Sequence, residues 1–323
     1  MKSGNLPGYA KTAGYWKRAT GGAAALGLTA LMLSGCFTGV EGTGKINLSK
    51  KDRIATAPTE EDRFISNIAS DPIGLWEKGR AFIVADEKFR LIAEGQGHSG
   101  INAGDTLLFY AVESASSADG GERTALSFKA NADNENATIG YTIEKPLEIA
   151  LREVTASEIP MLIDTQIVQS VKDRLLGRTL WVKTALWYGP GMQYKKGRKF
   201  EEVKVTDVKS GNAFFPVAVE FETPEGDSGS LMMNIGNSGN GSRNFGKLFS
   251  LTNPRNLYKH ITEENWEAIK MEEVRLGMTK EECKIAIGNP SDVTTGHNYS
   301  NAVEIWQYAD GRVLRFVDGI LVR

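Results

Sequence analysis

The chain has 323 residues, 41% of them hydrophobic and 24% charged, and its 38 Lys and Arg against 40 Asp and Glu give a formal net charge of −2. This length allows two or three domains, and the balanced charge excludes the strongly basic surface that nucleic-acid binding favours. Two cysteines and three scattered histidines show neither a disulfide framework nor metal-ligand spacing, so we expect no cofactor and no metal site.

The first 35 residues have the pattern of an export signal. Their charged residues are four basic ones, and an uncharged run of 13 residues, 21–33, follows them. That run is too short for a transmembrane helix, which needs about 20 apolar residues. A basic segment, a short apolar core and small residues together predict a secretory signal peptide over residues 1–35.

The signal ends in Leu33-Ser34-Gly35-Cys36, which resembles the bacterial lipobox. The resemblance implies cleavage before Cys36 and transfer of diacylglycerol to its thiol, the one group of the motif that can be alkylated. Mature bacterial lipoproteins carry three acyl chains there, and two or more chains hold a protein stably on a membrane. Phe37 follows Cys36 where Asp would stand in many inner-membrane lipoproteins. We therefore predict a lipoprotein anchored through Cys36 to the outer membrane, on its periplasmic face.

The mature chain would have 288 residues, the 323 less the 35 of the signal. Losing the signal's four basic residues from 38 leaves 34 against 40 acidic ones, a formal net charge of −6. Such a chain has no general attraction to nucleic acid or to anionic lipid headgroups. The expected partners are the membrane, through the lipid anchor, and other envelope proteins.

The middle of the chain predicts a tether and β-rich domains. Residues 36–62 are rich in Gly, Thr, Lys and Glu without a period, which indicates a flexible tether. Residues 63–155 predict a first β-rich domain, because runs such as 106–114 alternate with polar loops. Residues 156–261 predict a second, led by a helix over 157–176 with an apolar stripe. The close strand spacing favours one or two small antiparallel β domains, as sandwiches or SH3-like barrels.

Residues 262–323 predict a separate α+β unit. Thr262 is a candidate N-cap for one helix, and Thr279 opens a second with a capping box. Gly288 ends the second helix and Pro290 prevents its return. Two strands follow, over residues 303–308 and 313–317, with a tight turn at Asp318-Gly319 behind them.

The order of these signals resembles the SmpA/OmlA/BamE lipoprotein domain, the small subunit of the machine that assembles outer-membrane β-barrels. The resemblance covers about 60 of the 323 residues and has Ile287 where Leu is usual. It implies two helices on a three-stranded antiparallel sheet (ααβββ) and a place in outer-membrane protein complexes, and it does not imply an enzyme. The residues that carry it, expected to form the core and turns of the module or its contacts, are Gly277, Thr279, Gly288, Pro290, Trp306, Tyr308, Phe316 and Gly319.

One motif suggests catalysis. Gly226-Asp227-Ser228-Gly229 matches the nucleophile loop of chymotrypsin-like serine proteases, and His98 precedes Ser228 as a candidate base. The same residues are also of the types that form hairpin turns, and they stand between two predicted strands. His98 lies in a Gly-rich loop. The turn is the favoured interpretation, since a four-residue match often arises by chance.

Three hypotheses follow. The leading one is a non-enzymatic, lipid-anchored interaction or assembly factor of the cell envelope, acting in outer-membrane protein assembly or envelope integrity. The second is a serine hydrolase that uses Ser228. The third is a periplasmic binder of a small ligand or lipid in a β cavity.

Overall fold

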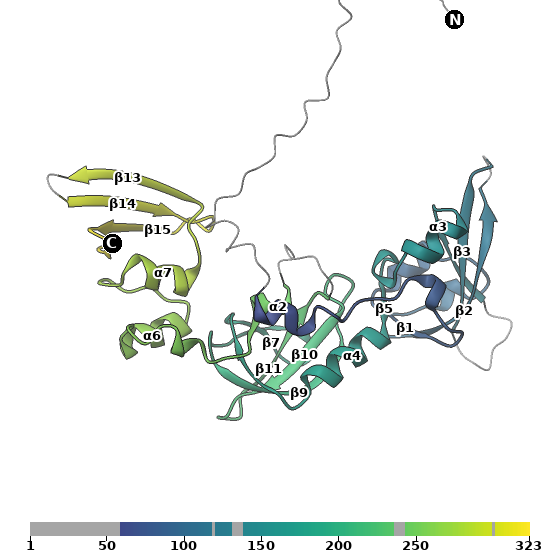
Figure 1. The fold of residues 1–323 in the computed structure, drawn as a ribbon, viewed down its shortest axis with the longest axis horizontal. Helices are drawn as coiled ribbons and strands as arrows, with labels where there is room; N and C mark the ends of the chain where they lie inside the picture. The colour runs from purple at the N-terminus through teal and green to yellow at the C-terminus, as the bar shows by residue number, and fades with distance from the viewer. Residues whose placement is uncertain (1–58, 118–119, 131–137, 236–242, 299–300) are drawn as a thin grey trace, which may run out of the picture. The chain divides into compact units, whose positions relative to one another are not determined.

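The computed structural model describes residues 59–117, 120–130, 138–235, 243–298 and 301–323. All of these residues belong to one compact unit, Ala55–Arg323. These residues form sixteen strands in three antiparallel sheets of five, seven and four strands, together with six α-helices (Figure 1). Within the described part of the chain, none of the helices combines the length and the apolar character that crossing a membrane requires.

The expected fold class, an α+β chain of small SH3-like domains followed by an ααβββ module, is wrong. The described chain is mostly β, and its first two sheets are open rather than closed into barrels, because each has two free ends in its strand order. The last sheet has four strands instead of three. The additional strand is Asp292–Asn298, whose Thr, Gly and Asn residues read as a loop but pair with the next strand along their full length.

The first sheet has the order β4-β3-β2-β1-β5. Its strands are β1 (Ala81–Val84), β2 (Thr106–Ser116), β3 (Glu122–Lys129), β4 (Thr138–Ile143) and β5 (Leu162–Asp164), and helix α3 (Leu147–Glu153) belongs to the same region. Alternate residues of β3 are buried, as expected for a sheet with one face on a core. In that core the rings of Phe82 and Phe128 meet edge to face, with centroids 5.7 Å apart. A buried ion pair joins Arg80 to Asp164 at 2.5 Å.

The second sheet has the order β12-β6-β9-β10-β11-β7-β8. Its strands are β6 (Thr179–Val182), β7 (Leu186–Tyr188), β8 (Tyr194–Lys196), β9 (Glu202–Ser210), β10 (Val217–Glu222), β11 (Ser228–Met233) and β12 (Phe249–Ser250). Helices α2 (Glu60–Ile65), α4 (Thr165–Leu175) and α5 (Phe245–Leu248) contribute to its core. The apolar stripe predicted for α4 is confirmed, since Ile167, Val168, Val171 and Leu175 are buried.

Helix α4 starts later than the sequence predicts. Residues 157–164 form instead a short 3-10 turn and strand β5. Pro160 explains the difference, because proline disfavours the helical conformation of the residue before it and removes an amide donor. The short 3-10 helices of the described chain are η1 (Ile73–Leu75), η2 (Glu87–Leu91), η3 (His98–Gly100), η4 (Ala156–Glu158), η5 (Pro190–Met192) and η6 (Pro254–Asn256).

The C-terminal sheet has the order β13-β14-β15-β16, and in Figure 1 its two helices lie on one side of it, α7 beside the sheet and α6 beyond α7. Its elements are α6 (Glu263–Lys270), α7 (Lys280–Ile287), β13 (Asp292–Asn298), β14 (Asn301–Gln307), β15 (Val313–Val317) and β16 (Ile320–Leu321). The two predicted helix starts are confirmed: Thr262 accepts from the Asn265 amide, and Thr279 and Glu282 form a reciprocal capping box. The predicted turn at Asp318-Gly319 joins β15 to β16.

A short segment between β8 and β9 joins the second sheet to the C-terminal module. The Phe200 ring stacks on Trp266 of α6 with centroids 5.3 Å apart and an interplanar angle of 11°. The Lys199 amide donates to the Lys270 carbonyl at 2.7 Å, and the Lys270 ammonium lies 2.9 Å from Glu201. These ring and main-chain contacts order the linking segment against α6.

Candidate functional site

Strand β13 is an exposed sheet edge. All seven of its residues pair with β14, from Asp292 opposite Gln307 to Asn298 opposite Asn301. Its side chains from Asp292 to His297 are exposed. Among the described residues, no strand pairs with the other long side of β13. An edge of this kind presents a row of unpaired backbone groups to solvent.

Backbone hydrogen bonds show which residues of β13 face outward. The Asp318 amide donates to the Ala302 carbonyl at 2.9 Å, and the Ala302 amide donates to the Asp318 carboxylate at 2.9 Å. Both backbone groups of Ala302 therefore point toward β15 and away from β13. In an antiparallel ladder the direction alternates along the strand, so Val303 and Ile305 of β14 bond β13. On β13 their partners are Gly296 and Thr294. The N–H and C=O groups that point away from the sheet therefore come from Val293, Thr295 and His297.

The other sheet edges among the described residues are short or covered. β12 has two residues and β5 has three, and all five are buried. β16 has only two residues. β8 has three residues, two of them lysines. β4 is covered in its middle, where Glu94 and Gly140 exchange hydrogen bonds of 2.9 and 2.8 Å. Lysine, proline and short length are common protections of an edge, and β13 has none of them.

Apolar side chains lie beside this edge on the sheet face that the helices do not cover. The helix-covered face carries Trp306 and Phe316, which are 2% and 0% exposed. Residues alternate across a sheet, so Val303 and Val317, paired with each other, lie on the opposite face. Ile320, paired with Val317, is on that face too and is 40% exposed. A partly exposed apolar row of this kind favours contact with another protein.

The residues that carry the predicted resemblance serve the core and the turns of the module. The ring centroids of Trp306 and Phe316 lie 4.5 Å apart, and the Tyr308 hydroxyl donates to the Gly288 carbonyl at 3.2 Å. Thr279 caps α7, and Pro290 follows the helix end in a partly buried position. Three glycines adopt the left-handed backbone that L residues disfavour, with φ of 88°, 85° and 85° at Gly277, Gly288 and Gly319.

Ser228 lies at the start of β11, behind a hairpin turn. The Thr223 amide donates to the Asp227 carbonyl at 2.8 Å, and Gly226 has a φ of 89°. The Lys195 ammonium donates to the Ser228 carbonyl at 2.8 Å and lies 3.2 Å from the Asp227 carboxylate. A groove of about 310 Å³ runs beside the turn, lined among others by Tyr188 and Ser228. The predicted turn chemistry is confirmed.

The structure does not bring His98 to Ser228. The His98 imidazole bonds the Gly95 carbonyl at 2.5 Å, beside the first sheet. His260 contacts Glu281 at 3.2 Å in the C-terminal module, and His297 is on β13. In the described chain, then, no imidazole is hydrogen-bonded to Ser228. The same residues contain no group of three or more His, Cys, Asp or Glu that could hold a metal ion.

Of the two cysteines, Cys36 lies outside the described residues. Cys283 of α7 is fully buried, and burial raises the pKa of its thiol to about 12. It therefore belongs to the core rather than to a reactive site.

Comparisons with known proteins identify no relative: no family model, no curated protein and no solved structure matches the chain. The resemblance of residues 262–323 to the SmpA/OmlA/BamE domain stays a prediction.

Proposed function

We propose that this chain is a non-enzymatic lipoprotein of the bacterial envelope that binds an extended segment of another envelope protein along β13. The binding part is supported by one observation above all, the seven-residue free edge of β13 with outward backbone groups at Val293, Thr295 and His297. The anchor rests on the signal peptide pattern and on Cys36. The outer membrane is the proposed location because Phe37 follows Cys36.

An exposed edge can bind a peptide by strand addition. The peptide's backbone hydrogen-bonds the outward groups, which provides affinity without a defined sequence, and its alternate side chains provide specificity. The three outward residues of β13 offer three N–H donors and three C=O acceptors. A partner strand aligned with all of β13 would extend the four-stranded sheet to five strands.

The side chains around the edge define the chemistry of the partner. On the face away from the helices β13 carries Asp292 at its start and then the small residues Thr294 and Gly296, and nothing lies within 4 Å of a Cβ built on Gly296. Large side chains from an added strand therefore have room to reach Val303 and Ile305 of β14. The partner segment should place apolar residues at alternate positions on this face.

The non-enzymatic part of the proposal is supported by the surroundings of Ser228. The cation beside Ser228 is Lys195, which donates to the serine's carbonyl oxygen and contacts Asp227. These contacts hold Lys195 against the turn, on the serine's main-chain carbonyl and the Asp227 carboxylate. A nucleophilic serine needs a base within hydrogen-bond reach of its hydroxyl.

Site-specific photo-crosslinking in membranes tests the binding. A crosslinking residue at His297 of the full-length chain should give a discrete adduct. Thr295→Pro should abolish that adduct because it removes one outward N–H, while Thr295→Ser should retain it. A crosslinker at the exposed Lys259 is the control. An adduct that survives Thr295→Pro in folded protein, or that also forms from Lys259, would refute strand addition.

Mass spectrometry of the mature N-terminus tests the anchor. The expected peptide begins at Cys36 and carries a diacylglyceryl group and a further acyl chain. Cys36→Ser should leave the protein unprocessed by this route and free of acyl chains. An unmodified Cys36 in membrane-bound wild-type protein would show that the anchor assignment is wrong.

A further inference from the structure

A cavity of about 240 Å³ lies where the chain passes between the first and second sheets. Two crossings of the chain line it. Residues 69–70 belong to the segment from α2 to η1, and residues 162–167 run from β5 into α4. Small-molecule sites often form where two packed regions adjoin, and those for drug-sized ligands measure about 300–1,000 Å³. This cavity is smaller and therefore suits a small molecule.

Most of the cavity wall is apolar and belongs to the two hydrophobic cores. Ala156 and Leu162 are core residues of the first sheet, and Ile163 and Ile167 are core residues of the second. All four are at most 9% exposed, so the packing around them fixes their side chains. Water in front of an apolar wall is poorly held, and an apolar group that displaces it gains affinity.

Hydroxyl groups lie on another part of the wall. The side-chain oxygens of Thr155 and Ser157 are 2.7 Å apart and share one hydrogen bond. One of the two O–H groups makes that bond, which leaves the other as a donor for a ligand. The Ser70 hydroxyl is already engaged, because it donates to the Asp164 carboxylate at 3.5 Å. The cavity therefore offers one polar end beside its apolar wall.

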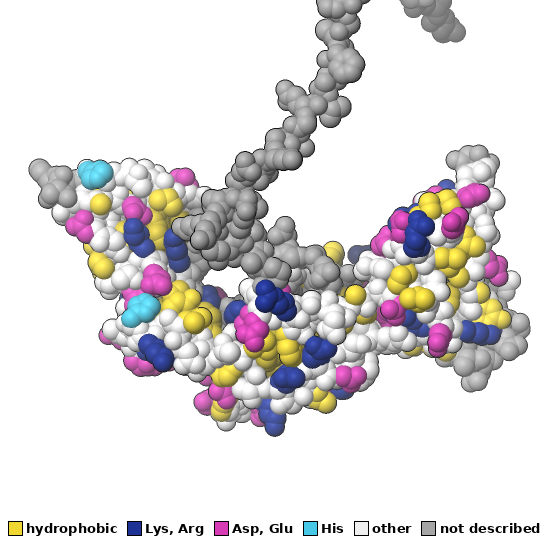
Figure 2. Space-filling view, in the orientation of Figure 1, with side chains coloured by type: hydrophobic (Ala, Val, Ile, Leu, Met, Phe, Trp, Pro, Cys, Tyr) yellow, Lys and Arg dark blue, Asp and Glu magenta, His cyan; other side chains and the backbone are white. Residues whose placement is uncertain are grey.

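The charge on the cavity wall is already compensated. Asp164 is the charged residue that lines the cavity, and its carboxylate accepts from Arg80 at 2.5 Å and from the Gln166 amide at 3.0 Å. A charged ligand would lose its hydration here without gaining a countercharge, which a neutral ligand avoids. On the face shown in Figure 2, Lys and Arg side chains are interspersed with Asp and Glu, without a field of one sign. These observations favour an uncharged ligand.

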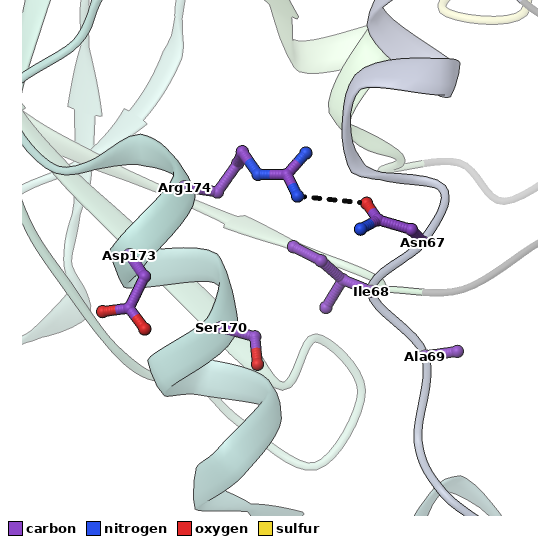
Figure 3. A pocket seen from close by; sticks show the side chains of 6 residues that line it. All are labelled: Asn67, Ile68, Ala69, Ser170, Asp173 and Arg174. Carbon is purple, nitrogen blue, oxygen red and sulfur yellow. Dashed lines mark hydrogen bonds between the residues drawn. The ribbon is translucent and has the colours of Figure 1, made fainter.

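Contacts with α4 hold the wall formed by residues 69–70 in place. The Arg174 guanidinium donates to the Phe64 carbonyl at 2.5 Å and to the Asn67 side-chain oxygen at 3.2 Å. Figure 3 shows Arg174 and Asn67 facing each other, with Ala69 further along the same segment. The pocket drawn there is a separate, more polar one that shares Ala69 with the apolar cavity. The cavity is thus preformed, as small-molecule sites usually are.

We propose that this cavity binds a small uncharged amphiphile, a short aliphatic chain that ends in a hydroxyl group. The chain packs on Leu162, Ile163 and Ile167, and the hydroxyl bonds the pair of Thr155 and Ser157. A ligand in this position touches both cores, so it stabilises the packing of the first sheet against the second. The site is independent of β13, so it can fail or succeed without affecting the proposed partner binding.

Photolabelling of the full-length chain in membranes tests the site. The probes are an octanol and an octanoic acid that carry the same diazirine in the chain, and the acid is ionised at neutral pH. Digestion and mass spectrometry count the adducts on residues 155–167 relative to those on α6, which lies away from the cavity. The alcohol should label residues 155–167 at least about tenfold more than the acid does, because only the acid brings an uncompensated charge. Equal labelling by the two probes would overturn the assignment to an uncharged ligand.

Variants of the cavity wall locate the labelling. Ser157→Leu should lower labelling by the alcohol at least about tenfold, because it fills space in the cavity and removes a hydroxyl. Ser157 is exposed, and Ala69→Leu, at an exposed position on another wall, is a second variant with the same expectation. Ser170→Leu is the matched control, since Ser170 is an exposed serine of α4 that lines the pocket of Figure 3 and not the cavity.

Ser170→Leu should be labelled like the wild type. The proposal is overturned if the alcohol labels residues 155–167 no more than α6, or if both cavity variants are labelled like the wild type. A loss of labelling in Ser170→Leu as large as that in Ser157→Leu would also overturn it.

Discussion

The Lys199 Nζ donates a hydrogen bond to the main-chain carbonyl oxygen of Ile285 at 2.6 Å. A second, longer bond of 3.3 Å reaches the Ala286 carbonyl. Both carbonyls lie in the last turn of α7, where helix carbonyls lack intrahelical partners and a cation is favoured. Burial lowers the pKa of Lys199, and the Glu272 carboxylate opposes that shift. Lys199 thus joins the second sheet to the C-terminal module.

Replacing this lysine should loosen the module. Lys199→Met keeps most of the aliphatic stem but leaves the two carbonyls without their donor, so we expect a loss of about 1–3 kcal/mol in the free energy of unfolding. Urea unfolding followed by tryptophan fluorescence measures it. Lys259→Met, at an exposed position, is the control and should change stability by less than about 0.5 kcal/mol.

The buried pair of Arg80 and Asp164 should be costly to break on one side. Asp164→Ala leaves the Arg80 guanidinium, whose side chain is 3% exposed, with only Asp71 as a carboxylate partner. We expect a loss of about 3–5 kcal/mol in thermal or urea unfolding. The double variant Arg80→Met with Asp164→Leu should recover part of it, because two apolar groups need no partner. Equal losses in both variants would argue against this account.

Acid should weaken the start of α7 through Glu282. Burial raises the pKa of Glu282, but hydrogen bonds from the Thr279 amide, Asn265 and the Thr279 hydroxyl outweigh it and hold the pKa below its ordinary value of 4.5. A carboxyl with a depressed folded-state pKa stabilises above its unfolded pKa, and this contribution is lost as pH falls through the folded value. The urea concentration at the unfolding midpoint of the wild type should therefore decrease as the pH is lowered below about 4.5. Glu282→Gln should show a smaller decrease over the same range.

Cys283 should be unreactive in the folded chain. With its pKa raised to about 12 by burial, the thiol is almost entirely protonated at pH 8. Maleimide should label it slowly in native protein and rapidly in urea. Rapid labelling of the native protein would mean that α7 opens readily.

Local signals in the sequence predict several caps and turns correctly, although the fold class expected from the whole sequence is wrong. Helix caps and tight turns depend only on residues a few positions apart, so their sequence patterns suffice to predict them. This holds for the caps Thr262 and Thr279 and for the turn at Asp318-Gly319. The helical stripe of α4 is equally local. Pro160 is also visible in the sequence, and it explains why α4 begins at Thr165 and not at residue 157.

The candidate sites depend on residues that are distant in the chain, and the sequence does not predict them. Arg174 donates to the Phe64 carbonyl across 110 positions of the chain, so this contact leaves no contiguous motif in the sequence. β13 carries a Gly and several polar residues, and its strand conformation comes from pairing with β14 rather than from propensity. The short match around Ser228 suggests a nucleophile, but a catalytic set also requires a base, and only the fold decides whether one lies beside the serine.

Hydrogen exchange at single-residue resolution is the most direct test of binding along β13. In purified full-length protein the amides of Val293, Thr295 and His297 should exchange fast, while that of Thr294, bonded to β14, should exchange slowly. In native membranes, with the partner present, the three outward amides should become protected, and in Thr295→Pro the amides of Val293 and His297 should stay fast. Outward amides that exchange equally fast in purified protein and in membranes would contradict strand addition at β13.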